Sequence, residues 1–271
     1  MKNKDLSPLQ IIPKNFKKNN KVLLLPIADF HLGLIATMSS TGNEYNMEIA
    51  EKYYKDVLLQ IKERIDGQEF EEILFVIGND FLNSDTLNST TTNGTPQDSV
   101  VFWHDMFDKA LELLIIGINT LVEISKVRVI NVVSNHDNQS MYAIMKAIDY
   151  YFKDNKNVIV DTSQLFRKYY FHGKVLIGFA HDLDIKNALS LITSEAKELW
   201  GKANKFYWIL AHLHQQMQYS KQGNLEIMRL PTISGWSRWS ASKGYVHSDQ
   251  RTQVFVIDGE HGILDVMNIF V

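Results

Sequence analysis

The first half of the chain alternates short, continuous apolar runs with segments whose apolar residues recur at helical spacing. Two runs cover residues 22–27 and 73–77, and a third, residues 127–133, is interrupted by Arg128 and Asn131; each has the length of a buried strand. Residues 44–65 and 141–152 carry apolar side chains three or four positions apart, which predicts helices. Thr95 followed by Pro96 predicts the start of another helix, ending near Ser125. Strands that alternate with helices predict an α/β fold with partly parallel strands.

The second half has a different pattern, in which strands follow one another closely from Val158 onward. Residues 168–182 predict a hairpin that turns at His172–Gly173, and one helix, about Ile185 to Leu199, interrupts the strands. Further strands are expected within residues 206–214, 225–233, 252–258 and 262–271. The two patterns predict two packed sheets in a single domain of residues 21–271, after a basic tail of residues 1–20.

Composition narrows the chemistry that the chain can perform. Its 271 residues are 45% hydrophobic and include no cysteine, so disulfides, thiolate zinc sites and Cys nucleophiles are excluded. No apolar run approaches the ~18 residues of a membrane span, and the basic N-terminus lacks the apolar middle of a secretory signal. We therefore expect a cytoplasmic protein without membrane contact. The net charge of −3 opposes a generally basic nucleic-acid binder but not a local basic groove.

Polar residues that can bind metals or transfer protons follow five of the predicted strands. They are Asp29-Phe30-His31, Gly78-Asn79-Asp80, Asn135-His136-Asp137, His181 and His212-Leu213-His214. In open α/β sheets, ligands bind at the carboxyl ends of the strands. The Asp-x-His and His-x-His pairs are two positions apart, so on an extended segment their side chains point the same way.

Each of these motifs also has a purely structural explanation when it is considered alone. Asp80 suits a turn, His181 suits a buried histidine with a partner, and a His-x-His pair is tolerated on a surface. Five such motifs, all at strand ends, are harder to explain in this way. Burying that many polar groups would lower the stability of the fold by several kcal/mol unless they are paired or bind metal.

The ordered set D-x-H, G-N-D, N-H-D, H and H-x-H resembles the motifs of the calcineurin-like metallophosphoesterases, and it spans Asp29 to His214. The resemblance implies a two-sheet α/β sandwich of βαβ-type units flanked by helices, with a binuclear metal centre. It assigns Asp29, His31 and His214 to one ion, Asn135, His181 and His212 to the other, and Asp80 as the bridge between them.

The residue types fit that chemistry. Two divalent ions ~3.5–4 Å apart need a bridging carboxylate, and a water shared between them becomes a hydroxide that attacks the phosphoester near neutral pH. Mixed oxygen and nitrogen ligands suit manganese, our first choice, and also iron, zinc, nickel or magnesium. The resemblance further implies that His136 binds a phosphoryl oxygen or protonates the leaving group, while Asp137 orients His136.

One position departs from the family pattern. The family usually reads Gly-Asp directly, whereas Asn79 stands between Gly78 and Asp80 here. An amide cannot supply two anionic oxygens, so we expect Asp80 to be the bridge, with a bulge at Asn79. Asp85 is the alternative bridge. The position three after the bridge, which is acidic or His in the family, is Asn83.

Two further segments indicate the substrate. Residues 91–98, TTNGTPQD, and residues 229–251 are similar to those of SbcD-like DNA-repair exonucleases of phages and bacteria. Cations in the later segment would contact phosphates and its aromatic rings would stack on bases, which makes substrate-binding candidates of Trp236, Arg238, Trp239 and Lys243. The alternative is that the rings pack against the second sheet and the charges are solvated. The polar loop from Asn83 to Gln97 is expected to lie over the metals.

The sequence thus predicts a metal-dependent phosphodiesterase, with a DNA nuclease as the first hypothesis and DNA as its partner. A nucleotide phosphodiesterase or phosphomonoesterase of the same fold is the second hypothesis. A metal-free binding scaffold is the third, and the complete ligand set argues against it. A homodimer or an SbcC-like ATPase partner is an expectation without support in the sequence.

Overall fold

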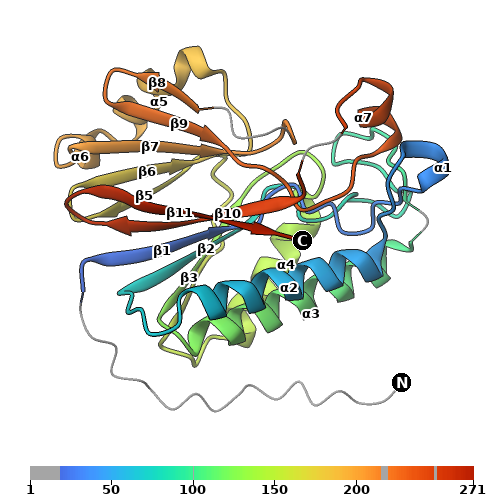
Figure 1. Cartoon of the computed structure of the whole chain (residues 1–271), viewed down its shortest axis with the longest axis horizontal. Coiled ribbons are helices and arrows are strands. Elements are labelled where there is room, and N and C mark those ends of the chain that lie inside the picture. Colours follow the sequence, from blue (N-terminus) through green and yellow to red (C-terminus); the bar gives the residue numbers. More distant parts are fainter. Residues whose placement is uncertain (1–18, 100, 215–218, 247–248) are drawn as a thin grey trace.

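The computed structural model describes residues 19–99, 101–214, 219–246 and 249–271, which form two β-sheets packed face to face between layers of helices (Figure 1). The larger sheet has six strands in the order β11-β10-β1-β2-β3-β4. Four of its strands are parallel: β1 Lys21–Pro26, β2 Glu72–Gly78, β3 Val127–Val132 and β4 Val158–Asp161. An antiparallel pair extends it beyond β1: β10 Arg251–Asp258 and β11 Gly262–Phe270.

Three long helices connect the parallel strands and cover the outer face of the larger sheet (Figure 1). They are α2 Met47–Arg64, α3 Trp103–Val122 and α4 Asn138–Tyr151. The first of them begins where the Asn46 side chain accepts a hydrogen bond from the Ile49 backbone N–H. Its buried residues recur at the spacing that the sequence shows, so the amphipathic pattern alone orients α2 on the sheet.

The smaller sheet has five strands in the order β5-β6-β7-β9-β8. Its central strands are parallel and its edge strands antiparallel: β5 Lys168–His172, β6 Val175–Phe179, β7 Lys205–Leu210, β8 Tyr219–Gln222 and β9 Leu225–Arg229. Its outer face is covered by η1 Ile185–Asn187, α5 Ala188–Glu195 and α6 Lys197–Trp200. Two short helices, α1 Met38–Thr41 and α7 Arg238–Ser242, lie beside each other away from both sheets (Figure 1).

Alternation along β1 separates the two main cores. Leu23 and Leu25 are buried against the three long helices, whereas Val22 and Leu24 are buried against the smaller sheet, in one cluster with Phe179. A parallel strand covered on both faces reads as a continuous apolar run, as this one does. The predicted α/β class, with two packed sheets and helix-flanked βαβ units, is confirmed.

The hairpin at His172–Gly173 is confirmed, because β5 and β6 are antiparallel and His172 lies opposite Val175. The helix predicted to start at Thr95–Pro96 is wrong in its start, since α3 begins at Trp103. Thr95 instead exchanges hydrogen bonds with Thr91, and Pro96 forms an isolated bridge with Thr90. Thr95 and Pro96 therefore belong to a threonine-rich turn, and they do not cap a helix.

Two other predictions need refinement. The helix predicted over about Ile185 to Leu199 is divided into η1, α5 and α6, with a break at Ala196. The predicted basic tail, residues 1–20, lies outside the described residues as far as residue 18. Among the helices that the structure describes, none has the length and apolar character to cross a bilayer.

Candidate metal centre

All five polar motifs lie on turns that directly follow strands β1, β2, β3, β6 and β7. Backbone hydrogen bonds tie three of the turns together. The Asp29 N–H donates to the Asn79 carbonyl at 2.7 Å, the His31 N–H donates to the Asp80 carbonyl at 3.0 Å, and the Asn79 N–H donates to Val132 O at 2.8 Å. These bonds continue the pairing of the parallel sheet beyond the strand ends, so the sheet itself sets the position of the motifs.

The turns are conformationally unusual. Seven non-glycine residues in the described part of the chain have positive φ, and six of them, with φ between 46° and 74°, lie in these turns: Asp29, His31, Asn79, Asp80, His212 and His214. Asn, Asp and His are the non-glycine residues enriched in this region of φ and ψ. Each such residue costs on the order of 1–3 kcal/mol, and such backbones concentrate at functional sites. The cluster is therefore marked as a site by its backbone as well as by its side chains.

One group of potential metal ligands is Asp29, His31 and His214, whose ligand atoms all lie within 4.8 Å of one another. His31 Nε2 is 2.9 Å from His214 Nε2, and Asp29 Oδ1 is 3.5 Å from His214 Nε2. Asp29 is fully buried, and its Oδ2 accepts a hydrogen bond from the His212 N–H. Its Oδ1 has no hydrogen-bond partner among the described residues, but it interacts electrostatically with His214. Burial lowers the pKa of His214, and Asp29 acts against burial and raises it.

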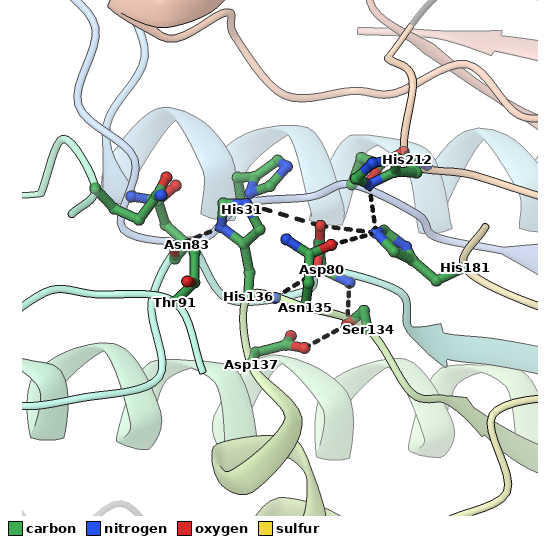
Figure 2. Close-up of polar contacts among 12 residues, drawn as sticks. His31, Asp80, Asn83, Thr91, Ser134, Asn135, His136, Asp137, His181 and His212 are labelled. Atoms are coloured by element: carbon green, nitrogen blue, oxygen red, sulfur yellow. Dashed lines mark hydrogen bonds and ion pairs between the residues drawn. The ribbon is translucent and has the colours of Figure 1, made fainter. Parts of the chain in front are cut away.

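The second group is Asp80, His181 and His212, again with ligand atoms within 4.8 Å. His181 Nε2 lies 3.0 Å from Asp80 Oδ2, 3.0 Å from Asn135 Oδ1 and 2.9 Å from His212 Nδ1 (Figure 2). His181 Nδ1 contacts Asn79 Oδ1 at 2.9 Å on the other side of the ring. Four residues thus direct a nitrogen or oxygen toward one point.

Asp80 interacts with both groups. Its Oδ2 lies between the His181 and His136 rings, and it also acts electrostatically on His31 of the first group (Figure 2). Burial raises the pKa of the Asp80 carboxyl, but His181 and the other histidines outweigh that effect and hold it well below its usual range. Burial lowers the pKa of His31, and the neighbouring His136 and His214 lower it further. Asp80 is therefore an anion among imidazoles.

Asp85, the alternative bridge, lies elsewhere. Its carboxylate accepts hydrogen bonds from the backbone N–H groups of Gln139 and Ser140, from the Ser140 hydroxyl at 2.7 Å and from Thr92 Oγ1. These contacts cap the first turn of α4, where an anion is favourable. Asp80 is the carboxylate that belongs to the histidine cluster, and Asp85 anchors the loop of residues 83–97 to α4.

The structure corrects the prediction that Asp137 orients His136. Asp137 Oδ1 accepts a hydrogen bond from Ser134 Oγ at 2.6 Å and Oδ2 accepts one from the Leu82 N–H at 2.8 Å, so its carboxylate points away from the His136 ring (Figure 2). His136 Nδ1 instead lies 2.8 Å from the Asn83 carbonyl. Adjacent side chains diverge here because Asp137 is the residue at which α4 begins.

The donor set fits divalent metal ions. The Asn79 amide oxygen can only accept, so the proton of a neutral His181 resides on Nδ1 and its Nε2 presents a lone pair. Burial lowers the pKa of His181, but the Asp80 carboxylate outweighs burial and raises it to about 9, so without a metal ion Nε2 holds a proton that it donates to Asp80. A divalent cation would take the place of that proton, with Asp80, Asn135 and His212 as its further ligands. Imidazole, carboxylate and amide ligands suit Mn, Fe, Zn or Ni, and the donor set does not select among these ions.

The late segment is connected to this cluster. Arg238 donates to Asp98 Oδ1 at 2.6 Å, the Asn83 side chain donates to the Asp98 carbonyl, and the Asn83 carbonyl contacts His136. Trp236 Nε1 donates to the Thr41 carbonyl, which ties α7 to α1. A chain of contacts thus connects Arg238 of α7 to His136 through Asp98 and Asn83.

The predicted substrate-binding residues divide into two kinds. The Arg238 charge is matched by Asp98 and the Trp236 indole N–H is engaged, whereas the Trp239 side chain is 62% exposed and Lys243 is exposed. Tyr245, 48% exposed, lies against Trp239 with ring centroids 5.8 Å apart. Both rings are therefore open to a partner.

Sequence reasoning missed two residues of the site. The first is Asn79, whose amide contacts His181, and the second is Asn83, whose backbone carbonyl contacts His136. Asn79 was visible as a departure from the family pattern, but its contact with a ring 102 positions later was not. A backbone contact such as that of Asn83 leaves no signal in the residue type.

No protein-family model matches the chain, and no curated protein sequence matches it. Solved structures align with it over nearly its full length. A dimetal phosphatase from Danio rerio is 8% identical, covers 92% of this chain and 98% of its own, and gives a TM-score of 0.44. An archaeal phosphodiesterase is 10% identical over 93% and 99%, with a TM-score of 0.41. A zinc complex of Vps29 from Entamoeba histolytica is 12% identical over 92% and 99%, with a TM-score of 0.36.

Proposed function

We propose that the chain is a metal-dependent phosphodiesterase with a binuclear centre. Asp29, His31 and His214 would hold one divalent ion, Asn135, His181 and His212 the other, and Asp80 would serve both. The observation that carries the proposal is the presence of two groups of potential metal ligands, each with ligand atoms within 4.8 Å of one another, together with the electrostatic effect that the Asp80 carboxylate of one group has on His31 of the other. When bound, the two ions would polarise a phosphoryl oxygen and lower the pKa of water toward neutrality.

His136 is the residue that would act on the substrate. Because its Nδ1 donates to the Asn83 carbonyl, its Nε2 faces the cluster, 4.0 Å from Asp80 Oδ2. When protonated, Nε2 can donate a hydrogen bond to a phosphoryl oxygen or a proton to the departing oxygen. The His136 side chain is 16% exposed, so a substrate can reach it without opening the fold.

DNA is the substrate that we favour, and the enzyme would then be a nuclease. Trp239 and Tyr245 offer exposed rings for stacking on bases, and Lys243 offers a cation for the backbone. Arg238 and Trp236 would position α7 through Asp98 and Thr41. The net charge of −3 requires the positive potential to be confined to the segment 236–245.

A nucleotide phosphodiesterase is the second candidate, and the Arg238–Asp98 pair favours it. Because Arg238 is paired with Asp98, Lys243 is the cation of segment 236–245 for which the described residues show no ion pair, and one such cation is few for a long polyanion. A mononucleotide diester has one base to stack on an aromatic ring and one phosphate to bind at the metal centre. The same residues would then bind a single nucleotide.

One experiment separates these functions. The purified chain, loaded with manganese, is offered linear duplex DNA, single-stranded DNA, bis(p-nitrophenyl) phosphate and p-nitrophenyl phosphate in parallel. We expect cleavage of DNA and of the diester, and no cleavage by Asp80→Asn purified in the same way. Cleavage of small diesters alone would select the second candidate. Two bound ions without any hydrolysis would leave a binding scaffold.

A further inference from the structure

Asn79 contacts the proposed centre from behind its ligands. Its Oδ1 lies 2.9 Å from His181 Nδ1, the ring nitrogen opposite the one that faces the cluster. Both side chains are buried, with 2% of Asn79 and 7% of His181 exposed. Because both groups are buried, water does not compete for this hydrogen bond. The bond therefore restricts the orientation of the His181 ring.

The backbone explains how a side chain reaches this position. Asn79 has a φ of 55°, and both its N–H and its carbonyl are engaged, with Val132 O and the Asp29 N–H respectively. Glycine, asparagine and aspartate are the residues that adopt such a conformation most readily. Of these three, only asparagine and aspartate carry an acceptor that can reach the His181 ring. The identity of residue 79 therefore decides whether His181 Nδ1 keeps this partner.

We propose that Asn79 is a positioning residue, which holds His181 with its proton on Nδ1 and its Nε2 lone pair directed at the second metal position. The inference rests on the proposed function, since it gives the purpose of the contact in a metal-binding protein. The partner of a ligating histidine fixes its tautomer and its ring orientation, and losing that partner typically costs 10–100-fold in metal affinity. Here the partner is a neutral amide, so the charge of the site is set by Asp29 and Asp80.

The test compares Asn79→Gly with Asn79→Asp. Glycine tolerates the positive φ and removes only the acceptor, whereas aspartate keeps an acceptor within reach of the ring. Ser89→Gly is the matched control, because Ser89, with a φ of 53°, is the one non-glycine residue of positive φ in the described chain that lies outside the ligand turns. Manganese binding to each metal-free protein is measured by titration calorimetry, and folding is checked by circular dichroism.

We expect Asn79→Gly to weaken one of two binding events by roughly 10–100-fold. Asn79→Asp should bind at least as tightly as the unaltered chain, and Ser89→Gly should be unchanged. Unaltered affinity in Asn79→Gly would overturn the inference. Equal losses in the Gly and Asp variants would also overturn it, because the residue would then act through the backbone alone. If the unaltered chain itself takes up no manganese, the proposed function fails first and is seen to fail separately.

Discussion

The ligand turns and the segment from Trp236 to Tyr245 are connected through Asp98 and Asn83 and are built in opposite ways. In the turns, Asp29, His31, Asp80 and His181 are buried, six residues have positive φ, and backbone hydrogen bonds join one strand end to the next. The segment is held by Arg238 and Trp236 through long side chains, while Trp239 and Tyr245 face solvent. The side chains of the first region contact one another, whereas Trp239 and Tyr245 of the second region are exposed to solvent.

This contrast has a consequence for mutation. In the buried ligand turns, the loss of one side chain disturbs the contacts of its neighbours, so a substitution there should have a large effect on turnover. In the exposed segment, a substitution removes one contact, so its effect should be small and should depend on the substrate. Substitutions in the turns should therefore affect all substrates, and substitutions in the segment should affect DNA alone.

The largest effect is expected from Asp80→Asn. The amide keeps the shape but removes the anion that contacts His181 and interacts electrostatically with His136 and His31. Turnover should fall by more than the ~100-fold that is typical of losing an outer partner of a ligand. Metal content measured by mass spectrometry should fall below two ions per chain.

Asp85→Asn is the matched control for that variant. Its carboxylate caps α4, so the substitution should lower the thermal unfolding temperature through a loss on the order of 0.5–2 kcal/mol and leave metal content unchanged. If Asp85→Asn emptied the site and Asp80→Asn did not, the two carboxylates would have exchanged roles.

The next largest effect is expected from His136→Ala. The ring belongs to neither ligand group, and the Asn83 carbonyl holds it, so both ions should remain while turnover falls about 10²–10⁴-fold. Turnover on the chromogenic diester and metal content are measured on the same sample. Asp137→Asn should cost less turnover than His136→Ala, and an equal loss would restore the carboxylate as the orienting group.

Much of the fold was predictable from the sequence because two periodicities are strong in it. Continuous apolar runs such as residues 22–27 marked strands covered on both faces, and the spacing from Ala50 to Ile65 marked α2. The start of α3 was not predictable, because Thr95 and Pro96 are equally good residues for the turn that they form. Local residue preference could not decide between the two uses.

The motifs of the candidate site were predictable from the sequence, but the contacts between their side chains were not. Parallel strands bring their carboxyl ends to one edge, so the sequence sufficed to place Asp29 near Asp80. Adjacency in sequence suggested that Asp137 serves His136, whereas the turn into α4 sends the two side chains apart. Direction within a turn depends on backbone angles that residue type does not specify.

In the exposed segment, Trp239→Ala sharpens the comparison. Stacking on an exposed ring contributes roughly 1–3 kcal/mol per base, so cleavage of single-stranded DNA should fall about 5- to 100-fold. The chromogenic diester should be cleaved as before, because it needs no stacking platform. Tyr150→Ala, which removes an exposed ring on α4, should change neither rate. A parallel loss of both substrates in Trp239→Ala would make the ring structural.

The smallest effect is expected from Lys243→Ala, and salt dependence is its most sensitive measure. Each phosphate contact releases counterions, so removing one cation that touches DNA should reduce the slope of log Kobs against log salt by about 1. Arg238→Ala is the matched comparison, since its charge is already matched by Asp98 and it should change the slope less. Binding is measured by fluorescence anisotropy of labelled single-stranded DNA at several salt concentrations.

Equal changes in slope for both variants would mean that the Arg238–Asp98 ion pair opens when DNA binds and that both cations contact the DNA backbone. No change for Lys243→Ala would place the DNA path away from α7.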